Sequence, residues 1–162
     1  GYLIDGKPLT GLSALEMGHI SIPHDLEKDP FAGNCPYHGD CFEGLAAGPA
    51  IFSRIGKRGE SIPDSNPFWL IEADYISHAL VNYILTLSPR IIVIGGGVMQ
   101  RTLLYDIVRQ KVREILNGYL KFDILAKEIS SYIVPPALGK YSGVLGAISM
   151  AMDLDKTIYN QQ

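Results

Sequence analysis

The feature that most constrains this chain is a run of three potential metal ligands. Cys35, His38 and Cys41 are each separated by two residues, and both cysteines of the chain lie in this run. Two intervening residues let a tight turn direct all three side chains to one centre, and Gly39 supplies the backbone freedom such a turn needs. Two thiolates and an imidazole are a donor set that suits zinc. A fourth nitrogen or sulfur ligand would close the site, so we expect a structural zinc ion rather than a hydrolytic one.

Two histidines upstream compete for the fourth position. His19 is favoured because Glu16 and Gly18 beside it resemble parts of a site, whereas His24 begins a charged run over residues 24–30 that is typical of a solvated loop. A second interpretation has no metal, only two thiols with an incidental histidine between them. Three donors in one run are less common than an isolated Cys-x-x-Cys, which favours the metal.

Composition excludes several classes of protein. A chain of 162 residues with 47% hydrophobic and 19% charged residues is sufficient for one domain with a core. Its net charge of −3 gives no support for a nucleic-acid partner. Its apolar runs fall well short of the roughly 20 residues that a membrane helix needs. Cysteines placed as metal ligands fit a reducing compartment, so we expect a cytoplasmic protein without a membrane contact.

The N-terminal part is expected to be irregular apart from one hairpin. Residues 2–9 alternate like a strand interrupted by Asp5-Gly6, which is a strong hairpin signal. Residues 19–43 have little periodicity and are rich in glycine, proline and charge. A loop this long needs an internal tether, and zinc binding would supply folding free energy to roughly 25 residues that lack a core of their own.

Helical periodicity begins after this loop. Apolar residues at helical spacing run from Gly44 to Gly56, and Pro49 indicates that the helix proper starts there. A polar linker over residues 57–67 separates this helix from the longest one. That helix carries a core-facing stripe over residues 76–87 and ends at Ser88-Pro89.

Strands and helices alternate in the second half. Residues 90–94 form a short apolar, β-branched run typical of a strand covered on both faces, and a helix is expected at about 103–116. A second strand over 131–134 leads to a helix at 143–152 whose small residues permit close packing against a sheet. The tail from residue 155 is expected to fray. This alternation predicts an α/β fold.

These motifs together resemble the ROK family of sugar kinases. The segments Glu-x-Gly-His at 16–19, Cys-Pro-Tyr-His-Gly-Asp-Cys-Phe-Glu at 35–43 and Gly-Leu-Ala-Ala-Gly-Pro-Ala at 44–50 are similar to the family's zinc-binding and sugar-binding segment. Most members carry three cysteines there, and the Cys-Pro-Tyr-His form resembles the bacterial fructokinase branch. The resemblance continues through residues 94–99 and 132–136.

The resemblance implies one lobe of the ribonuclease H-like actin/hexokinase (ASKHA) α/β fold, with a zinc-stapled loop insertion. The family's Asp-x-Gly-Gly-Thr-like phosphate loop and its N-terminal aspartate segment are not found in these residues. We therefore expect residues 1–162 to be the C-terminal lobe of a longer kinase, divided into a hairpin remnant (1–12), a zinc and sugar loop (13–43), the α/β lobe (44–155) and a tail (156–162).

The resemblance also implies specific roles around the metal. The expected zinc ligands are His19, Cys35, His38 and Cys41, and the expected sugar contacts are Glu16, His19 and Glu43. Carboxylates accept hydrogen bonds from vicinal hydroxyls, and a kinase must hold its acceptor alcohol rigidly. Taken alone, Glu43 could equally be an acidic residue that stabilises a helix N-terminus.

Three consecutive glycines after the first strand indicate a second site. Gly95, Gly96 and Gly97 would let the backbone approach a nucleotide, although the segment matches neither the Gly-x-Gly-x-x-Gly fingerprint nor a Walker loop. Without the family, tight strand–helix packing explains them as well. The resemblance implies that these glycines with Val98 and Met99 form the adenosine-binding turn, and that Pro49 lies along the nucleotide.

The implied reaction is that of a fructokinase, in which Mg²⁺·ATP phosphorylates D-fructose to fructose 6-phosphate. The catalytic base is expected in the N-terminal lobe, so this chain alone should be inactive, and the family implies a homodimer. One alternative is the sugar-sensing lobe of a ROK transcriptional repressor. Another is a zinc-stapled binding module that does not use ATP.

Overall fold

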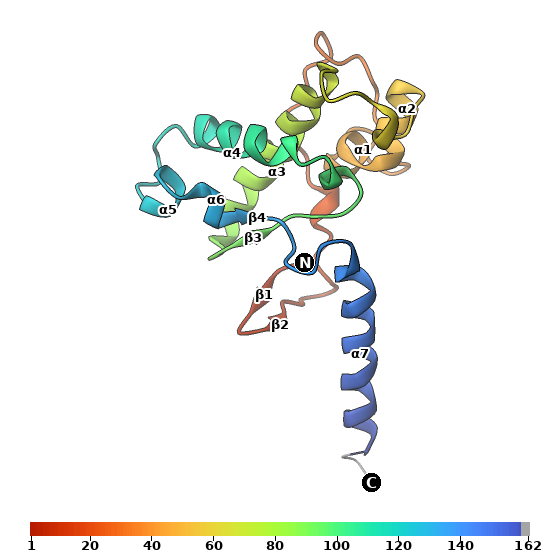
Figure 1. Ribbon diagram of the computed structural model, residues 1–162, viewed down its shortest axis with the longest axis vertical. Coiled ribbons are helices and arrows are strands. Elements are labelled where there is room, and N and C mark those ends of the chain that lie inside the picture. Colours follow the sequence, from red (N-terminus) through yellow and green to blue (C-terminus); the bar gives the residue numbers. More distant parts are fainter. Residues whose placement is uncertain (160–162) are drawn as a thin grey trace.

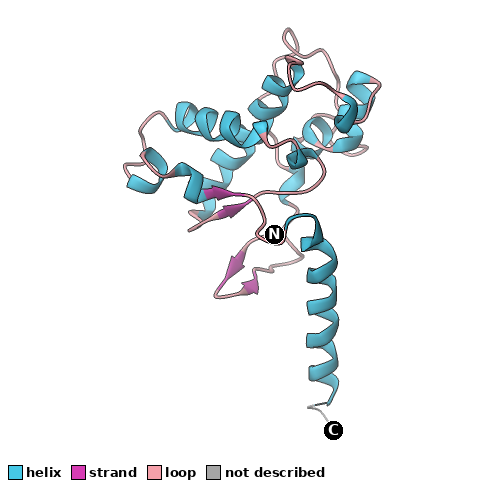
Figure 2. Cartoon of the chain, viewed as in Figure 1, coloured by secondary structure: helices cyan, strands magenta, loops and turns pink. Residues whose placement is uncertain are grey.

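The computed structural model describes residues 1–159, with the side chains of residues 1–152. Helices dominate, with two short strand pairs (Figures 1 and 2). In chain order the elements are β1 (Leu3–Ile4), β2 (Lys7–Pro8), η1 (Met17–His19), α1 (Phe42–Ala46), α2 (Gly48–Ile55), η2 (Gly59–Ser61), α3 (Phe68–Leu87), β3 (Ile92–Val93), η3 (Val98–Gln100), α4 (Leu103–Leu116), α5 (Asp123–Ala126), α6 (Ile129–Tyr132), β4 (Ile133–Val134), η4 (Gly139–Tyr141) and α7 (Ser142–Tyr159).

The predicted hairpin is confirmed. Strands β1 and β2 pair antiparallel, and the two residues between them, Asp5 and Gly6, both have positive φ, at 51° and 77°. Two left-handed residues in succession match the twist that a two-residue hairpin requires, and Asp-Gly tolerates them at low cost. The hydroxyl of Tyr2 donates to the carbonyl of Leu87 over 3.0 Å, which ties the hairpin to the end of α3.

Helices α3 and α4 form the centre of the core. Helix α3 ends at Ser88, which adopts a left-handed φ of 45°, and α4 has the bounds predicted from periodicity. The predicted stripe on α3 is buried or half-buried throughout. The two helices pack together around fully buried side chains, among them Trp69, Ala73, Leu104, Val108 and Val112.

The segment after the loop forms two helices where the sequence predicted one. Helix α1 ends at Ala46, Ala47 is extended (φ −82°, ψ 158°), and α2 then starts with Pro49 in its first turn. Proline has no backbone N–H and cannot continue a preceding helix, which explains the break. Gly56, at φ 74°, ends α2 as predicted.

A strand forms within the predicted residues 90–94 but covers only Ile92–Val93, and the expectation that both of its faces are covered is wrong. Strand β3 pairs parallel with β4, in the register Ile92 with Ile133. Ile91 and Val93 are 51% and 59% exposed. The sheet has only two strands within residues 1–159, and no described element covers the outer face. The second strand is shorter than predicted, because residues 131–132 belong to α6.

Helix α7 also departs from the prediction. It extends away from the body of the molecule instead of packing on the sheet (Figure 1), and its apolar side chains, such as Val144, Ile148 and Met150, are exposed. Small residues permit close packing but do not supply a partner. The helix continues over residues 155–159, where fraying was predicted, and the remaining tail residues 160–162 lie outside the described part.

None of the helices in residues 1–159 combines the length and apolar character that crossing a lipid bilayer requires.

One buried carboxyl group in α3 lacks a partner. The side chain of Glu72 is 0% exposed, and neither of its oxygens has a hydrogen-bond partner among the described residues. Burial raises the pKa of Glu72 well above its usual value, the charge of Arg54 partly offsets this, and the charge of Asp29 adds to it. Burial therefore favours the protonated, neutral form of this carboxyl in the folded protein.

We predict that Glu72→Gln stabilises the protein increasingly as pH rises. Because the pKa of Glu72 is higher in the folded than in the unfolded protein, protonation of Glu72 stabilises the folded state fully below the unfolded pKa of about 4.5. As pH rises, this contribution to the free energy of unfolding is lost by up to about 1.4 kcal/mol per pH unit, until the folded pKa is reached. Glutamine does not ionise, so urea unfolding at about pH 5 and about pH 8 should show a larger advantage of the variant at the higher pH. An advantage that does not change with pH would mean that Glu72 is ionised when folded.

Candidate metal centre and nucleotide cavity

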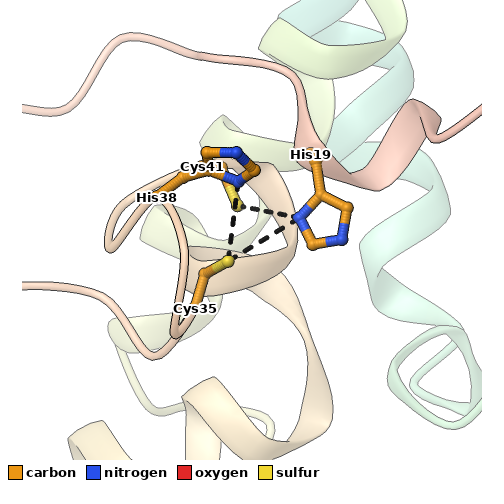
Figure 3. Close-up of side chains that lie close together, drawn as sticks. All are labelled: His19, Cys35, His38 and Cys41. Carbon is orange, nitrogen blue, oxygen red and sulfur yellow. Dashed lines mark hydrogen bonds between the residues drawn. The ribbon is translucent and has the colours of Figure 1, made fainter.

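Four nitrogen and sulfur donors converge at the start of α1. His19 comes from η1, and Cys35, His38 and Cys41 come from the loop that leads into the helix (Figure 3). The Nδ1 atom of His19 lies 3.7 Å from Cys35 Sγ and 3.6 Å from Cys41 Sγ, and His38 Nδ1 lies 3.7 Å from Cys35 Sγ. All four potential ligand atoms lie within 4.8 Å of one another. The four residues predicted as zinc ligands are therefore brought together.

These separations fit a tetrahedral zinc ion. Bond lengths of about 2.3 Å to sulfur and about 2.0 Å to nitrogen place a sulfur and a nitrogen about 3.5 Å apart around one such ion. The sulfur–nitrogen distances of 3.6–3.7 Å are close to this value. Four protein ligands would leave no position for water, as in a structural site.

The loop reaches this geometry because glycines allow its backbone to pack closely. Cys35 and Gly39 exchange backbone hydrogen bonds of 3.1 and 3.0 Å, and Gly39 has φ 64°. A Cβ atom on Gly33 or on Gly44 would lie 2.1 or 2.0 Å from the carbonyl oxygen of Gly39, closer than real contacts allow. The turn that aims the donors therefore depends on glycine at both flanking positions as well as at Gly39.

The two thiols have different electrostatic surroundings. Hydrogen bonding to sulfur, chiefly from the backbone N–H of His38, lowers the pKa of the Cys35 thiol to about 6. Burial raises the pKa of the Cys41 thiol. A bound zinc ion would deprotonate both, since coordination requires thiolates.

His24 is not part of the donor cluster. Its Nδ1 atom lies 3.1 Å from Asp40 Oδ2, and its Nε2 atom lies 3.0 Å from the carbonyl oxygen of Asp29, so both ring nitrogens are engaged. The prediction that residues 24–30 form a solvated loop is wrong for these residues, because the side chains of His24 and Asp29 are only 4% and 5% exposed. Asp29 is buried because Arg54 and Tyr75 both bind its carboxylate. This network links residues far apart in the sequence, so no local sequence pattern predicted it.

The candidate sugar contacts lie beside the metal ligands. Glu43 stands in the first turn of α1, and its Oε2 atom lies 3.7 Å from Nε2 of His19, on the side of the ring opposite the sulfurs. Glu16 precedes η1, is exposed, and its carbonyl accepts a hydrogen bond from the backbone N–H of His19. The hydroxyl of Tyr83 donates to the carbonyl of Met17, which fixes η1 on α3.

A cavity of about 850 Å³ lies between the start of α2 and the turn after β3. Of the predicted nucleotide contacts, Pro49, Gly97 and Val98 line it. Met99 instead belongs to the hydrophobic core. Gly95 faces Pro136, whose ring carbon would lie 2.9 Å from an added Cβ, so the packing explanation applies to this glycine. Gly96, at φ 90°, makes the turn itself.

The cavity has walls that the sequence motifs did not indicate. The guanidinium of Arg101 lies 4.6 Å from the ring centroid of Trp69 and also binds Asp64 and the carbonyl of Gly59. All four residues line the cavity. A cation held on an aromatic face and fixed by a carboxylate is a rigid wall, and Arg101 is 37 residues away from Asp64 in the sequence.

Comparisons with known proteins identify the family of this chain. The model of the ROK family matches residues 1–154. A protein from Bacillus subtilis named "Putative fructokinase" is 48% identical over 151 residues, covering 93% of this chain and 50% of that protein. A fructokinase from Pediococcus pentosaceus is 40% identical over 151 residues, covering 93% and 51%. The chain thus spans about half the length of the curated relatives it matches.

A solved structure shows the same fold. The crystal structure of a "putative sugar kinase" from Cytophaga hutchinsonii superposes with a TM-score of 0.56 at 17% identity, covering 93% of this chain and 52% of that one. At this identity the likeness establishes the fold alone.

We predict that Cys41→Ser abolishes metal binding and loosens residues 19–43. Serine oxygen is a poor zinc ligand. Loss of a residue that only contacts a zinc ligand lowers metal affinity by up to about a hundredfold, so loss of the ligand Cys41 itself should lower the affinity for zinc by more than that. Metal content by mass spectrometry and limited proteolysis of the loop measure both effects. His78→Gln on α3 is the matched control, because His78 lies outside the cluster. A Cys41→Ser protein with bound zinc and an unchanged melting temperature would exclude Cys41 from the site.

Proposed function

The chain belongs to the ROK family and has the fold of its sugar kinases, and from this we propose that it forms the C-terminal lobe of an ATP-dependent kinase that converts D-fructose to fructose 6-phosphate. The observation that carries the proposal is the pairing, on one lobe, of a zinc-type donor cluster flanked by carboxylates with a cavity lined by Pro49, Gly97 and Val98. Relatives named as fructokinases match most of the chain, which supports fructose as the substrate.

The carboxylates beside the cluster would bind and orient the sugar. Glu16 and Glu43 are both exposed and adjacent to His19, so their oxygens can accept hydrogen bonds from vicinal hydroxyls. Transfer of a phosphoryl group depends mainly on holding the acceptor hydroxyl in line with the γ-phosphate. We assign no catalytic base to this chain and propose that an aspartate of the N-terminal lobe accepts the proton.

The metal would order the loop and would take no part in the reaction of the substrate. His19, Cys35, His38 and Cys41 would hold zinc in a closed site, and zinc there would supply folding free energy to the loop. Because His19 directs Nδ1 to the sulfurs and Nε2 toward Glu43, fixing this ring also fixes the surroundings of the proposed sugar contact.

The cavity would receive ATP, with Mg²⁺ carried on the phosphates. Gly97 would let the backbone approach the nucleotide, and Pro49 lines the same cavity. We further propose a cytoplasmic homodimer that binds no nucleic acid, in keeping with the net charge of −3 and thiols placed as metal ligands. A sugar-sensing repressor of the same family is not favoured, because the relatives that match most of the chain are named as kinases.

The test is ATP-dependent phosphorylation by the full-length protein that contains this chain, with fructose, glucose, mannose and N-acetylglucosamine as acceptors. We expect turnover to be fastest with fructose. A protein that binds one of these sugars but phosphorylates none would contradict the proposal.

We predict that Glu16→Ala and Glu43→Ala each raise KM for fructose by about tenfold or more and lower kcat. A hydrogen bond to a charged group contributes roughly 1.5–3 kcal/mol, and the same contact positions the reacting hydroxyl. Steady-state kinetics of the full-length variants measure this effect. Glu114→Ala, on the exposed side of α4, should match the unmodified protein. Unchanged kinetics in both glutamate variants would remove them from the sugar site.

We predict that Gly97→Ala raises KM for ATP by about tenfold without lowering the melting temperature. A Cβ on Gly97 meets no atom within 4 Å and its φ is −59°, so the substitution costs the fold little. The methyl group would instead occupy space that the nucleotide needs, at a cost of about 1.4 kcal/mol. Gly146→Ala in α7 is the control, since its Cβ is also unobstructed and lies away from the cavity. An unchanged KM for ATP would place the nucleotide elsewhere.

A further inference from the structure

A buried arginine near the end of α2 contacts two other segments. The side chain of Arg54 is 7% exposed, its Nε atom donates to Asp29 Oδ1 over 3.2 Å, and its Nη2 atom lies 3.0 Å from Asp29 Oδ2. Its Nη1 atom donates to the carbonyl oxygen of Leu45 in α1 over 3.0 Å. The guanidinium thus donates one hydrogen bond to the carboxylate of Asp29 and one to the carbonyl of Leu45, while Nη2 lies within ion-pair distance of the same carboxylate without a hydrogen bond of its own among the described residues.

Aromatic side chains hold this arginine in place. Its guanidinium carbon lies 4.5 Å, 5.4 Å and 5.7 Å from the ring centroids of Phe31, Phe68 and Tyr75. The hydroxyl of Tyr75 donates to Asp29 Oδ2 over 2.6 Å. Charged groups surrounded by rings are poorly solvated, so the Arg54–Asp29 pair is stiff and sensitive to displacement.

Two routes connect this pair to the metal ligands. Along the first, His24 bridges the carbonyl of Asp29, at 3.0 Å, and the carboxylate of Asp40, at 3.1 Å, and Asp40 immediately precedes Cys41. Along the second, Cys41 is the N-cap of α1, and the carbonyl of Leu45 in that helix accepts from Arg54. A displacement of Cys41 would therefore be transmitted to Arg54 along both routes.

The other end of α2 forms the nucleotide cavity. Gly48, Pro49, Ile51 and Phe52 all line it, and Arg54 follows within the same helix. The contacts of Arg54 fix the carboxyl end of this helix of eight residues. The same contacts consequently fix the angle at which its first turn meets the cavity.

We propose that Arg54 is a positioning residue that couples the metal loop to the nucleotide cavity through α2, so that metal binding and nucleotide binding strengthen each other. The inference rests on the proposed function, because it takes the cavity to bind the nucleotide. By linkage, the factor by which nucleotide raises the affinity for zinc must equal the factor by which zinc raises the affinity for nucleotide.

The test measures this linkage directly in the full-length protein. The dissociation constant of zinc is determined by competition with a chromophoric chelator, with and without a saturating non-hydrolysable ATP analogue and Mg²⁺. We expect the analogue to tighten zinc binding by at least about fivefold, the lower end of typical coupling between sites. This readout does not depend on turnover, and comparison of the factor between the unmodified protein and variants at the Arg54–Asp29 pair assigns the coupling to Arg54.

The variant replaces both charges, as Asp29→Asn with Arg54→Met, because loss of the arginine alone would leave a buried carboxylate unpaired. In this protein the effect of the analogue on zinc affinity should fall to a factor near one. His24→Gln, which leaves the buried ion pair intact and interrupts one of the two routes, should reduce the factor without abolishing it. Lys28→Met is the control, since it removes the exposed Lys28–Asp25 pair in the same loop and should retain the full factor.

Two results would overturn the inference alone. One is an unmodified protein that phosphorylates a hexose but whose zinc affinity does not respond to the analogue. The other is an undiminished factor in the Asp29→Asn, Arg54→Met protein. An unmodified protein that neither binds the analogue nor phosphorylates any hexose would overturn the proposed function, and this inference with it.

Discussion

The structure depends on the convergence of His19, Cys35, His38 and Cys41 at one point. The long loop before α1 contains no helix or strand between η1 and α1, and its ends are joined where these donors meet. The sulfur–nitrogen distances of 3.6–3.7 Å match one tetrahedral zinc ion, so a single ion can add folding free energy to a segment whose other buried contacts come from a few side chains such as Ile22 and Asp29. The three glycines whose backbones pack in the turn serve the same geometry.

Elements that start at this point lead to both halves of the proposed active site. Helix α1 begins at Cys41 and carries Glu43 toward His19, and α2 follows after one extended residue with its first turn on the cavity. Arg54 then returns to the loop through Asp29. The candidate metal loop, the candidate sugar contacts and the proposed nucleotide cavity thus share a short stretch of chain. This proximity makes their coupling physically reasonable.

Local patterns in the sequence predicted much of this arrangement. Spacing identified Cys35, His38 and Cys41, and the neighbours of His19 favoured it as the fourth donor. The hairpin followed from its Asp-Gly turn, the bounds of α4 from apolar periodicity and the end of α3 from the Ser-Pro pair after it. Properties that depend on partners could not be predicted in the same way. An apolar strand does not reveal that no layer covers Val93, and a helix of small residues does not reveal that α7 extends freely. The burial of Asp29 depends on Arg54, 25 residues away, and on Tyr75, 46 residues away.

The most direct test of the central claim is X-ray absorption spectroscopy at the zinc edge on the purified full-length protein. We expect one zinc ion per chain with two sulfur neighbours at about 2.3 Å and two nitrogen neighbours at about 2.0 Å. A protein isolated without zinc, or a spectrum with only oxygen and nitrogen neighbours, would contradict it. The loop would then be ordered by contacts such as those of Asp29 with Arg54 and Tyr75, and the proposed sugar site would lose its support.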